Sequence, residues 1–299
     1  MSLNNTQKDY LEKLKQEFLE LSPGKESLLI MIDESEISEA VYNSNAIENS
    51  TLTLQETEKI LLDIDFSSNL SLREIYEAKN LARVVEYIRN KADAVKLNKE
   101  LILLVHKMLI GGINDEIAGR FREKNEYVKV ANHIAPAPEQ VEALIDSALI
   151  SFNSKQSIYF LERISKFHLE FEHIHPFCDG NGRIGRVLIN LLFLKFGFPP
   201  IIIRDKEKSD YYDAFREFDI NQRTKLMDKI LYLNLTEAMH KRLAYLNSKR
   251  IIRLTEYSEN EKLAKNSVLN MAKRQTIRAF RERGVWKIGV GTNVPCGHL

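Results

Sequence analysis

The stretch that decides the fold is His175-Pro176-Phe177-Cys178-Asp179-Gly180-Asn181-Gly182-Arg183-Ile184-Gly185-Arg186, which lies between two apolar segments. Before it, apolar residues recur at helical spacing from Phe160 to Phe171. After it, a nearly all-apolar run predicts a second helix at the centre of the core, which Gly197 and the prolines beyond it terminate. Pro176 and the glycines prevent one continuous helix. The stretch therefore predicts a helix end, a tight loop and a new helix start within a mainly α-helical protein.

The loop combines the groups that phosphate chemistry requires. Glycines on both sides of Asn181 allow backbone N–H groups to converge on an anion at the start of the next helix. Arg183 and Arg186 follow with planar guanidinium groups that match phosphate oxygens. Asp179 would repel a bare phosphate, which predicts a bridging Mg²⁺ ion. His175 is the only group of the loop that accepts a proton near neutral pH. Together these residues predict transfer of a phosphate-containing group from a nucleotide to a hydroxyl.

Each part of this pattern also has a simpler explanation. A Gly-x-Gly segment is usually a turn, a histidine beside a proline is usually structural, and two nearby arginines often lie on the surface. Their coincidence within twelve residues favours the functional interpretation.

The loop resembles the signature of Fic (Fido) domain proteins, His-x-Phe-x-Asp/Glu-Gly-Asn-Gly-Arg-x-x-Arg. All eight specified positions match: His175, Phe177, Asp179, Gly180, Asn181, Gly182, Arg183 and Arg186. The resemblance extends from about residue 35 to residue 240. It implies a protein adenylyltransferase, which transfers AMP from ATP to a Ser, Thr or Tyr hydroxyl of a target protein with Mg²⁺ and releases pyrophosphate.

The resemblance also implies a role for each residue of the loop. His175 corresponds to the general base and Asp179 to the Mg²⁺ ligand. Gly180, Asn181 and Gly182 correspond to the residues that hold the α- and β-phosphates. Arg183 and Arg186 correspond to the residues that hold the β- and γ-phosphates, and Phe177 to the residue that anchors the loop in the core.

Two further segments resemble parts of the same family. The pattern from Tyr127 to Ile134 predicts a short β-hairpin. Together with the preceding Gly119-Arg120-Phe121-Arg122, this hairpin resembles the family's flap. In the family the flap pairs with the target backbone as an added strand. The resemblance implies four docking residues: Val128, Lys129, Val130 and Ile134. Tyr212, in the pair Tyr211-Tyr212, resembles an aromatic residue beside the adenine, although burial in the core explains each tyrosine equally well.

Ser44-Asn45-Ala46-Ile47-Glu48-Asn49 resembles the family's inhibitory pattern, in which Ser44, Glu48 and Asn49 are the specified residues. It lies at the end of a helix expected over about residues 35–49, for which Asp33 or Ser35 would supply the N-cap. A carboxylate presented to Arg186 would occupy the guanidinium that holds the γ-phosphate. The hypothesis is that Glu48 autoinhibits transfer through Arg186. In some relatives the same glutamate positions a water that removes AMP, so AMP removal by this chain stays open as an alternative activity.

Composition describes an ordinary globular protein. The chain has 299 residues, of which 44% are apolar and 28% charged, with a net charge of +1. Collagen-like, disordered and membrane-spanning classes are excluded, and no signal segment precedes the helices, so a cytoplasmic location is expected. Cys178 and Cys296 are too far apart for a zinc-ligand spacing or a disulfide framework.

The near-zero net charge conceals an asymmetry. Residues 1–240 hold 30 Lys/Arg and 38 Asp/Glu, a net −8, whereas residues 241–299 hold 13 and 4, a net +9. In this basic tail we expect a helix that ends near Lys273 and a second helix from Gln275. That second helix would turn Ile277 and Phe280 inward and Arg278, Arg281 and Arg283 outward. Gly284 would end it, a strand over 285–288 would follow, and residues 291–299 would be a loose end.

This order of elements resembles an excisionase-type winged helix-turn-helix, which implies contact with DNA phosphates and a groove. A docking module whose basic face stays in water is an equally open interpretation.

We therefore expect a mainly α protein in three parts: an N-terminal helical region (1–110), a catalytic core (111–240) and a basic winged-helix-like domain (241–299). The leading hypothesis is an autoinhibited AMP transferase acting on a protein. Transfer of another nucleotide or phosphate moiety, AMP removal, and a DNA-binding regulator with a nucleotide-sensing pocket are the alternatives. DNA through the basic domain and a second copy of the chain stay open as partners, and no membrane is expected.

Overall fold

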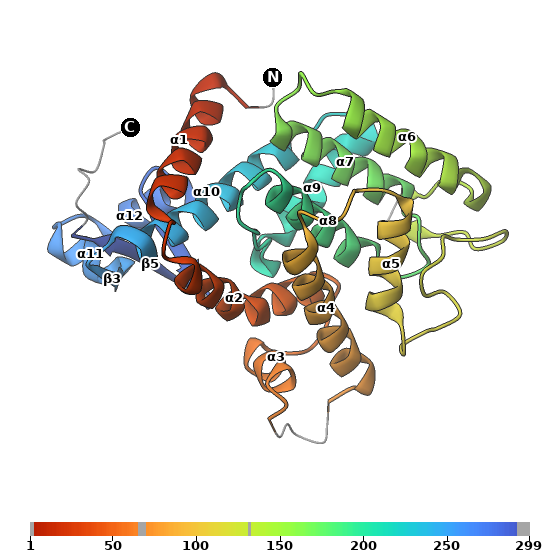
Figure 1. Ribbon diagram of the computed structural model, residues 1–299, viewed down its shortest axis with the longest axis horizontal. Helices are drawn as coiled ribbons and strands as arrows, with labels where there is room; N and C mark the ends of the chain where they lie inside the picture. The colour runs from red at the N-terminus through yellow and green to blue at the C-terminus, as the bar shows by residue number, and fades with distance from the viewer. Residues whose placement is uncertain (1–2, 65–69, 131–132, 292–299) are drawn as a thin grey trace.

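A computed structural model describes residues 3–64, 70–130 and 133–291, and over these residues the fold is mainly α-helical (Figure 1). The first helices are α1 (Asn5–Leu21), α2 (Glu26–Ile47), α3 (Leu54–Leu61), α4 (Leu72–Lys91) and α5 (Lys99–Ile110). A hairpin of β1 (Lys129–Val130) and β2 (His133–Ile134) follows. Next come the 3₁₀ turn η1 (Pro138–Gln140), α6 (Val141–Ser154), α7 (Phe160–Ile174), α8 (Asn181–Lys195), η2 (Asp205–Glu207), α9 (Lys208–Asn221) and α10 (Lys225–Asn247). The chain continues with β3 (Arg250–Arg253), α11 (Leu254–Asn260), α12 (Lys265–Lys273), β4 (Ala279–Glu282) and β5 (Val285–Val290).

The two helices predicted on either side of the loop are confirmed as α7 and α8. Helix α8 is buried along nearly its whole length, from Asn181 to Phe193, as its all-apolar sequence requires. It lies at the centre of Figure 1 and packs against α4, α5 and α7. Gly197, with a φ of 73°, follows its end. The loop between α7 and α8 is therefore fixed at both ends by the core.

Helix α2 is longer than expected. It begins at Glu26 rather than near residue 35, so the expected capping role of Asp33 and Ser35 is wrong. Asp33 instead accepts a hydrogen bond from Arg242, and the Ser35 hydroxyl donates to the carbonyl of Ile32. The helix ends at Ile47, and Glu48 is the next residue, which agrees with the expected end near residue 49.

The C-terminal part has its own small core. Strands β3, β5 and β4 form an antiparallel sheet in that order, and α11 and α12 pack over it. Ile252, Val268, Ala279 and Ile288 are buried there. Helix α10 runs without a break through residue 240, where we expected the domain division, and packs against β4 and β5.

The helix expected from Gln275 is wrong, because Ala279–Glu282 forms strand β4. Arg283 and Gly284 both have positive φ, 50° and 76°, and make a two-residue hairpin turn into β5. Gly284 therefore turns a hairpin and does not end a helix. The strand expected over 285–288 is confirmed within β5.

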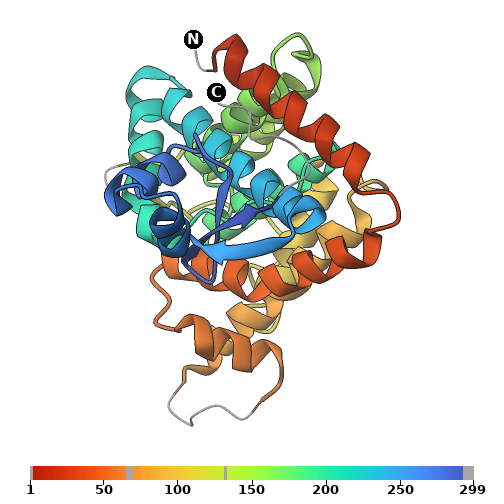
Figure 2. The same cartoon turned by 90° about the vertical axis from the view of Figure 1, so that its left-hand side faces the viewer.

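The arginines of this hairpin contact the acidic body. Arg278 donates to both carboxylate oxygens of Glu17 at 2.6 and 2.8 Å, and Arg281 and Arg283 bind Glu237 and Glu58. The outward orientation expected for Arg281 is wrong, since its side chain is only 13% exposed. Figure 2 shows the blue sheet against α2 and α10. The charge asymmetry of the sequence is thus partly neutralised inside the molecule.

Parts of two expected features, the hairpin and the C-terminal end, lie outside the residues that the structure describes. Ala131 and Asn132 of the hairpin and most of the expected loose end, including Cys296, lie outside the described residues. Cys178 is a free thiol. Among the described helices, none combines the length and the apolar composition needed to cross a bilayer.

Candidate active site

The loop between α7 and α8 is closed by its own side chains. His175 follows α7 in the left-handed conformation, with a φ of 50°, and Gly180 precedes α8 with a φ of 85°. The Asn181 side chain accepts from the backbone N–H of Phe177 at 2.9 Å and donates to its carbonyl at 2.8 Å. The Phe177 ring is buried and stacks on His106 with a centroid separation of 3.7 Å. Phe177 is thus placed as predicted, whereas the Asn181 side chain shapes the loop.

His175 is held as a neutral imidazole. Burial lowers its pKa to about 4, so the ring is unprotonated at neutral pH and can accept a proton. Its backbone carbonyl accepts from Arg122 Nε at 2.8 Å. The sequence did not indicate a role for Arg122, which also donates to the carbonyls of Glu126 and Pro136 at 2.9 Å. Arg122 therefore connects the loop between α7 and α8 to both ends of the hairpin.

Arg186 and the end of α2 meet as the inhibitory pattern predicts. Arg186 Nη2 lies 2.8 Å from Glu48 Oε1, its Nε donates to the Ser44 hydroxyl at 2.9 Å, and Nη2 also donates to the Ser44 carbonyl. The Arg186 side chain is 7% exposed and that of Glu48 is 38% exposed. Asn49, the third residue of the pattern, adopts the left-handed conformation with a φ of 67°. Its role is to end the helix, because that conformation cannot continue it.

Two neighbouring residues fix this end of α2. A Cβ added at Gly182 would lie 2.1 Å from Glu48 Oε1, so glycine at this position permits the close approach of Glu48. The Tyr212 hydroxyl donates to the carbonyl of Ile47 at 2.9 Å. Tyr211 is fully buried, and its hydroxyl lies 2.6 Å from His168 Nε2. Tyr211 is therefore a core residue, while Tyr212 lies beside the end of α2.

Arg183 and Asp179 belong to a charged cluster that α4 completes. Arg183 lies 3.0 Å from Asp179 and 3.2 Å from Glu77, and Arg73 lies 2.5 Å from Asp179 and 3.1 Å from Glu77. Nothing in the sequence pointed to Arg73 or Glu77, because they lie about a hundred residues before the loop and show no motif. Two guanidinium groups thus balance the Asp179 carboxylate.

A second carboxyl group, Glu172, lies near Arg186. Its Oε1 is buried, and that burial together with the neighbouring Glu48 charge raises the pKa of the carboxyl group to about 8, so it is largely protonated at pH 7. A Cβ at Gly185 would lie 2.3 Å from its Oε1. Glu48 is therefore the carboxylate that pairs with Arg186, and Glu172 does not compete with it at neutral pH.

A cavity of about 280 Å³ opens at this loop. Its lining comes from the end of α2, from α4 and from the loop itself, and includes Glu48, Arg73, Asp179, Gly180 and Arg183. Two buried guanidinium atoms at the site, Arg183 Nε and Arg186 Nη1, have no hydrogen-bond partner among the described residues. The site therefore offers donors that an anionic ligand could satisfy.

The predicted hairpin is confirmed as β1 and β2, which pair antiparallel with Lys129 opposite Ile134 and Val130 opposite His133. Lys129, Val130 and Ile134 are exposed, Ile134 to 71%, and Val128 is partly buried just before β1. The described residues of the hairpin expose strand edges and apolar side chains, as a docking strand requires.

Comparison with known proteins relates this site to a family. Residues 96–193 match the Fic/DOC family. A protein adenylyltransferase Fic from Drosophila erecta is 28% identical over 300 residues, which cover 92% of this chain and 59% of that protein. A Fic domain-containing signaling protein from Bacteroides thetaiotaomicron has a TM-score of 0.70 and 25% identity over 79% of this chain and 96% of that one. A Fic family protein from Desulfovibrio desulfuricans has a TM-score of 0.67 and 20% identity, covering 98% of both chains.

The chain spans 35–59% of the length of the curated relatives that it matches first. The family profile covers the segment from the start of α5 through most of α8, which contains the hairpin and the complete loop. The likeness to the Desulfovibrio protein extends this agreement in fold to nearly the whole chain. Residues 96–193 therefore match the Fic/DOC family, and the mainly helical fold of the chain is similar to that of the solved Fic proteins.

Proposed function

We propose that this chain transfers AMP from ATP to a hydroxyl side chain of a target protein. The observation that carries the proposal is His175: a neutral imidazole at the start of a loop with two arginines, each of which has one buried nitrogen without a hydrogen-bond partner among the described residues. A base and an anion site side by side suit attack of a hydroxyl on a phosphate. Relatives named protein adenylyltransferase Fic support the choice of reaction.

In the proposed reaction the target hydroxyl forms a bond to the α-phosphorus of ATP. Its proton passes to the unprotonated ring of His175, and the bond from the α-phosphorus to the bridging oxygen breaks, so pyrophosphate leaves with that electron pair. The backbone N–H groups at the start of α8 and the guanidinium groups of Arg183 and Arg186 hold the phosphates. Arg122 positions His175 through its carbonyl.

Asp179 suits the Mg²⁺ ion that accompanies ATP. It is a carboxylate at the mouth of an anion site, and Mg²⁺ in proteins is commonly held by one or two carboxylates together with substrate phosphates. When bound, the ion would offset the negative charge of the phosphates. Arg73 and Arg183 balance the carboxylate in the structure, so ligand binding would redistribute these pairs.

We also propose that Glu48 inhibits this transfer. Arg186 cannot present the same N–H groups to a γ-phosphate while Glu48 and Ser44 accept them. ATP whose phosphates are displaced would hold its α-phosphorus out of line with the target hydroxyl, and a displacement of about 1 Å can cost about 100-fold in rate.

A Glu48→Gly variant tests the reaction. We expect it to label proteins with ATP that carries ³²P at the α-position and not with ATP labelled at the γ-position. The double variant Glu48→Gly/His175→Ala should label about 10²–10⁴-fold more slowly, the usual contribution of a general base. Label from the γ-position would indicate phosphate transfer, and preferential use of α-labelled UTP would indicate another nucleotide. Undiminished labelling by the double variant would refute the role of His175.

The target is proposed to dock along the hairpin of β1 and β2, whose edge can accept an extended segment. Residues 241–299 are proposed to act as a module docked on the catalytic part. DNA binding is not proposed, because Arg278, Arg281 and Arg283, on which that hypothesis depended, bind carboxylates of the body.

A further inference from the structure

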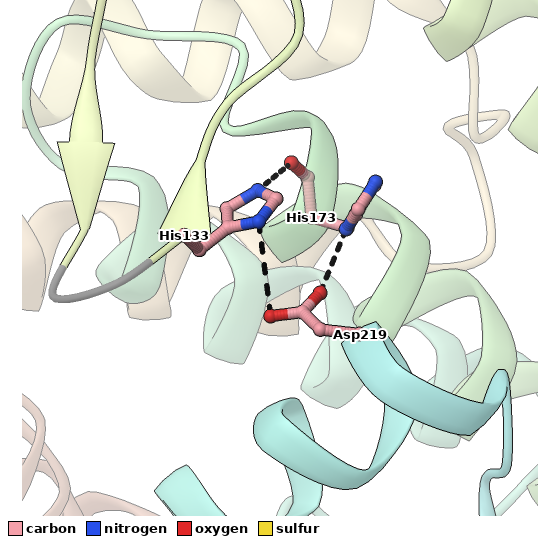
Figure 3. Close-up of side chains that lie close together, drawn as sticks. All are labelled: His133, His173 and Asp219. Atoms are coloured by element: carbon pink, nitrogen blue, oxygen red, sulfur yellow. Dashed lines mark hydrogen bonds and ion pairs between the residues drawn. The ribbon is translucent and has the colours of Figure 1, made fainter.

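Three side chains from three separate elements converge beside the flap (Figure 3). His133 comes from β2, His173 from the last turn of α7, and Asp219 from α9. One nitrogen of each imidazole and a carboxylate oxygen all lie within 4.8 Å of one another. His173 is two residues before His175, but its Nδ1 faces Asp219 at 2.7 Å. This cluster is separate from the charged cluster around Asp179 and has no part in the proposed transfer.

The hydrogen bonds of His133 determine which nitrogen is free. Its Nε2 lies 2.8 Å from the backbone carbonyl of His173, and since a carbonyl only accepts, Nε2 carries a proton. In the neutral ring Nδ1 is then unprotonated and faces Asp219 Oδ2 at 3.8 Å. A lone pair and a carboxylate oxygen thus face each other, an arrangement that a cation between them would stabilise.

The separations suit one transition-metal ion. Zinc binds histidine nitrogen and carboxylate oxygen at about 2.0–2.2 Å, so tetrahedral ligands stand about 3.4 Å apart. The two contacts of Asp219, 2.7 and 3.8 Å, lie on either side of that spacing. The bond from His133 Nε2 to a carbonyl is the outer hydrogen bond that ligating histidines usually make. Two imidazoles favour Zn²⁺ over Mg²⁺, which prefers oxygen ligands.

We propose that His133, His173 and Asp219 bind a Zn²⁺ ion, with a fourth position open to water. In the neutral ring, binding moves the proton of His173 from Nδ1 to Nε2, which frees the Nδ1 lone pair for the ion. The ion links strand β2 of the flap to α7 and α9 and so fixes the flap next to the loop. This second role rests on the proposed function, because it concerns the docking of a target along the flap, whereas the binding of zinc does not.

The first test is calorimetric titration of the chelator-treated full-length chain with ZnCl₂. We expect one Zn²⁺ per chain, and no competition from millimolar MgCl₂. His173→Gln and Asp219→Asn should each weaken zinc binding by about 100-fold or more, beyond the 10- to 100-fold usual for an outer-shell residue. Asp213→Asn, an exposed position on the same helix, should bind as wild type.

A second control addresses the end of the chain, where Cys296 and His298 could also bind zinc. The double variant Cys296→Ser/His298→Gln should retain the one-to-one binding. Loss of binding in that variant, or undiminished binding in His173→Gln and Asp219→Asn with unchanged circular dichroism, would refute the site and show only a histidine–aspartate ion pair.

The role of the site is tested by hydrogen exchange. Zinc should slow exchange of the backbone amides of β1 and β2 in the wild type and leave Asp219→Asn unchanged. Zinc that binds without protecting these amides would refute the link to the flap. Labelling by Glu48→Gly is a separate readout, so failure of the AMP-transfer proposal would leave the zinc result intact.

Discussion

Arg186 is buried and Arg281 is mostly buried, and both bind carboxylates, yet their surroundings differ. Arg186 meets a single carboxylate, Glu48, through one nitrogen, and that side chain is 38% exposed. Arg281 binds Glu237 through Nε, Nη2 and its own backbone N–H, binds Glu207 as well, and stacks on the Trp286 ring at 4.7 Å. The Glu237 side chain is 7% exposed.

The difference separates an exchangeable contact from a permanent one. Glu48 retains access to water, and one N–H group of Arg186 has no partner among the described residues, so a phosphate can replace the carboxylate at little cost. Glu237 cannot be replaced in this way. Burial alone would raise its pKa, but the charges of Arg204 and Arg281 hold that pKa below its ordinary value. The first contact suits regulation, and the second attaches the basic hairpin to the body.

The largest effect is expected at the permanent contact. Glu237→Gln should lower the free energy of unfolding by about 3 kcal/mol or more, because it leaves Arg204 and Arg281 buried with less compensating charge. Urea unfolding followed by circular dichroism measures this. Glu207→Gln is the matched control on the same arginine; its carboxylate is 41% exposed, and it should cost less than about 1 kcal/mol. Equal losses of unfolding free energy in the two variants would show that the buried Glu237 contributes no more to stability than the exposed Glu207.

The next effect is expected at the exchangeable contact. Glu48→Gly should raise the initial rate of AMP transfer by about 100-fold, because Arg186 becomes available to the γ-phosphate. The free energy of unfolding should change little beside the loss in Glu237→Gln. Glu34→Gln, exposed on the same helix, should leave the rate unchanged. A Glu48→Gly protein as slow as wild type with every nucleotide would contradict the inhibitory role.

A smaller effect is expected at Tyr212, whose hydroxyl holds the Ile47 carbonyl at the end of α2. Tyr212→Phe removes a hydrogen bond worth about 1 kcal/mol, which corresponds to a factor of about five, so the transfer rate should rise about fivefold. The aromatic ring remains available for contact with the adenine. In the Glu48→Gly background the same change should have no effect, because the contact it supports is gone. An equal increase in both backgrounds would show that Tyr212 acts elsewhere.

The sequence predicted the parts of this comparison unequally, for physical reasons. The loop at Arg186 was predictable because its glycines, arginines and flanking helical spacing are local features. The hairpin at Arg281 was mistaken for a helix because Ile277 and Phe280 stand three residues apart, as on a helix face. Its strand depends on pairing with β5 and on the Arg283-Gly284 turn. Likewise Arg73 and Arg122 reach the site only through tertiary packing. Arg73 lies in no motif, and the resemblance that includes Arg122 assigned it no contact with the loop.

The smallest effect is expected in the pH dependence, which tests whether Glu48 acts on Arg186 or on His175. Burial lowers the pKa of His175 to about 4, and the Glu48 charge is only a minor opposing influence, so the ring is neutral above about pH 5 with or without Glu48. The ratio of kcat/KM between Glu48→Gly and wild type should therefore stay constant from about pH 5.5 to 7.5, since kcat/KM reports the ionisation of the free enzyme. Both proteins should lose activity only as the pH falls toward 4, where the imidazole becomes protonated. A ratio that changes about tenfold between pH 6 and 7 would show that Glu48 controls the protonation of His175, and Arg186 would then not be the point at which inhibition acts.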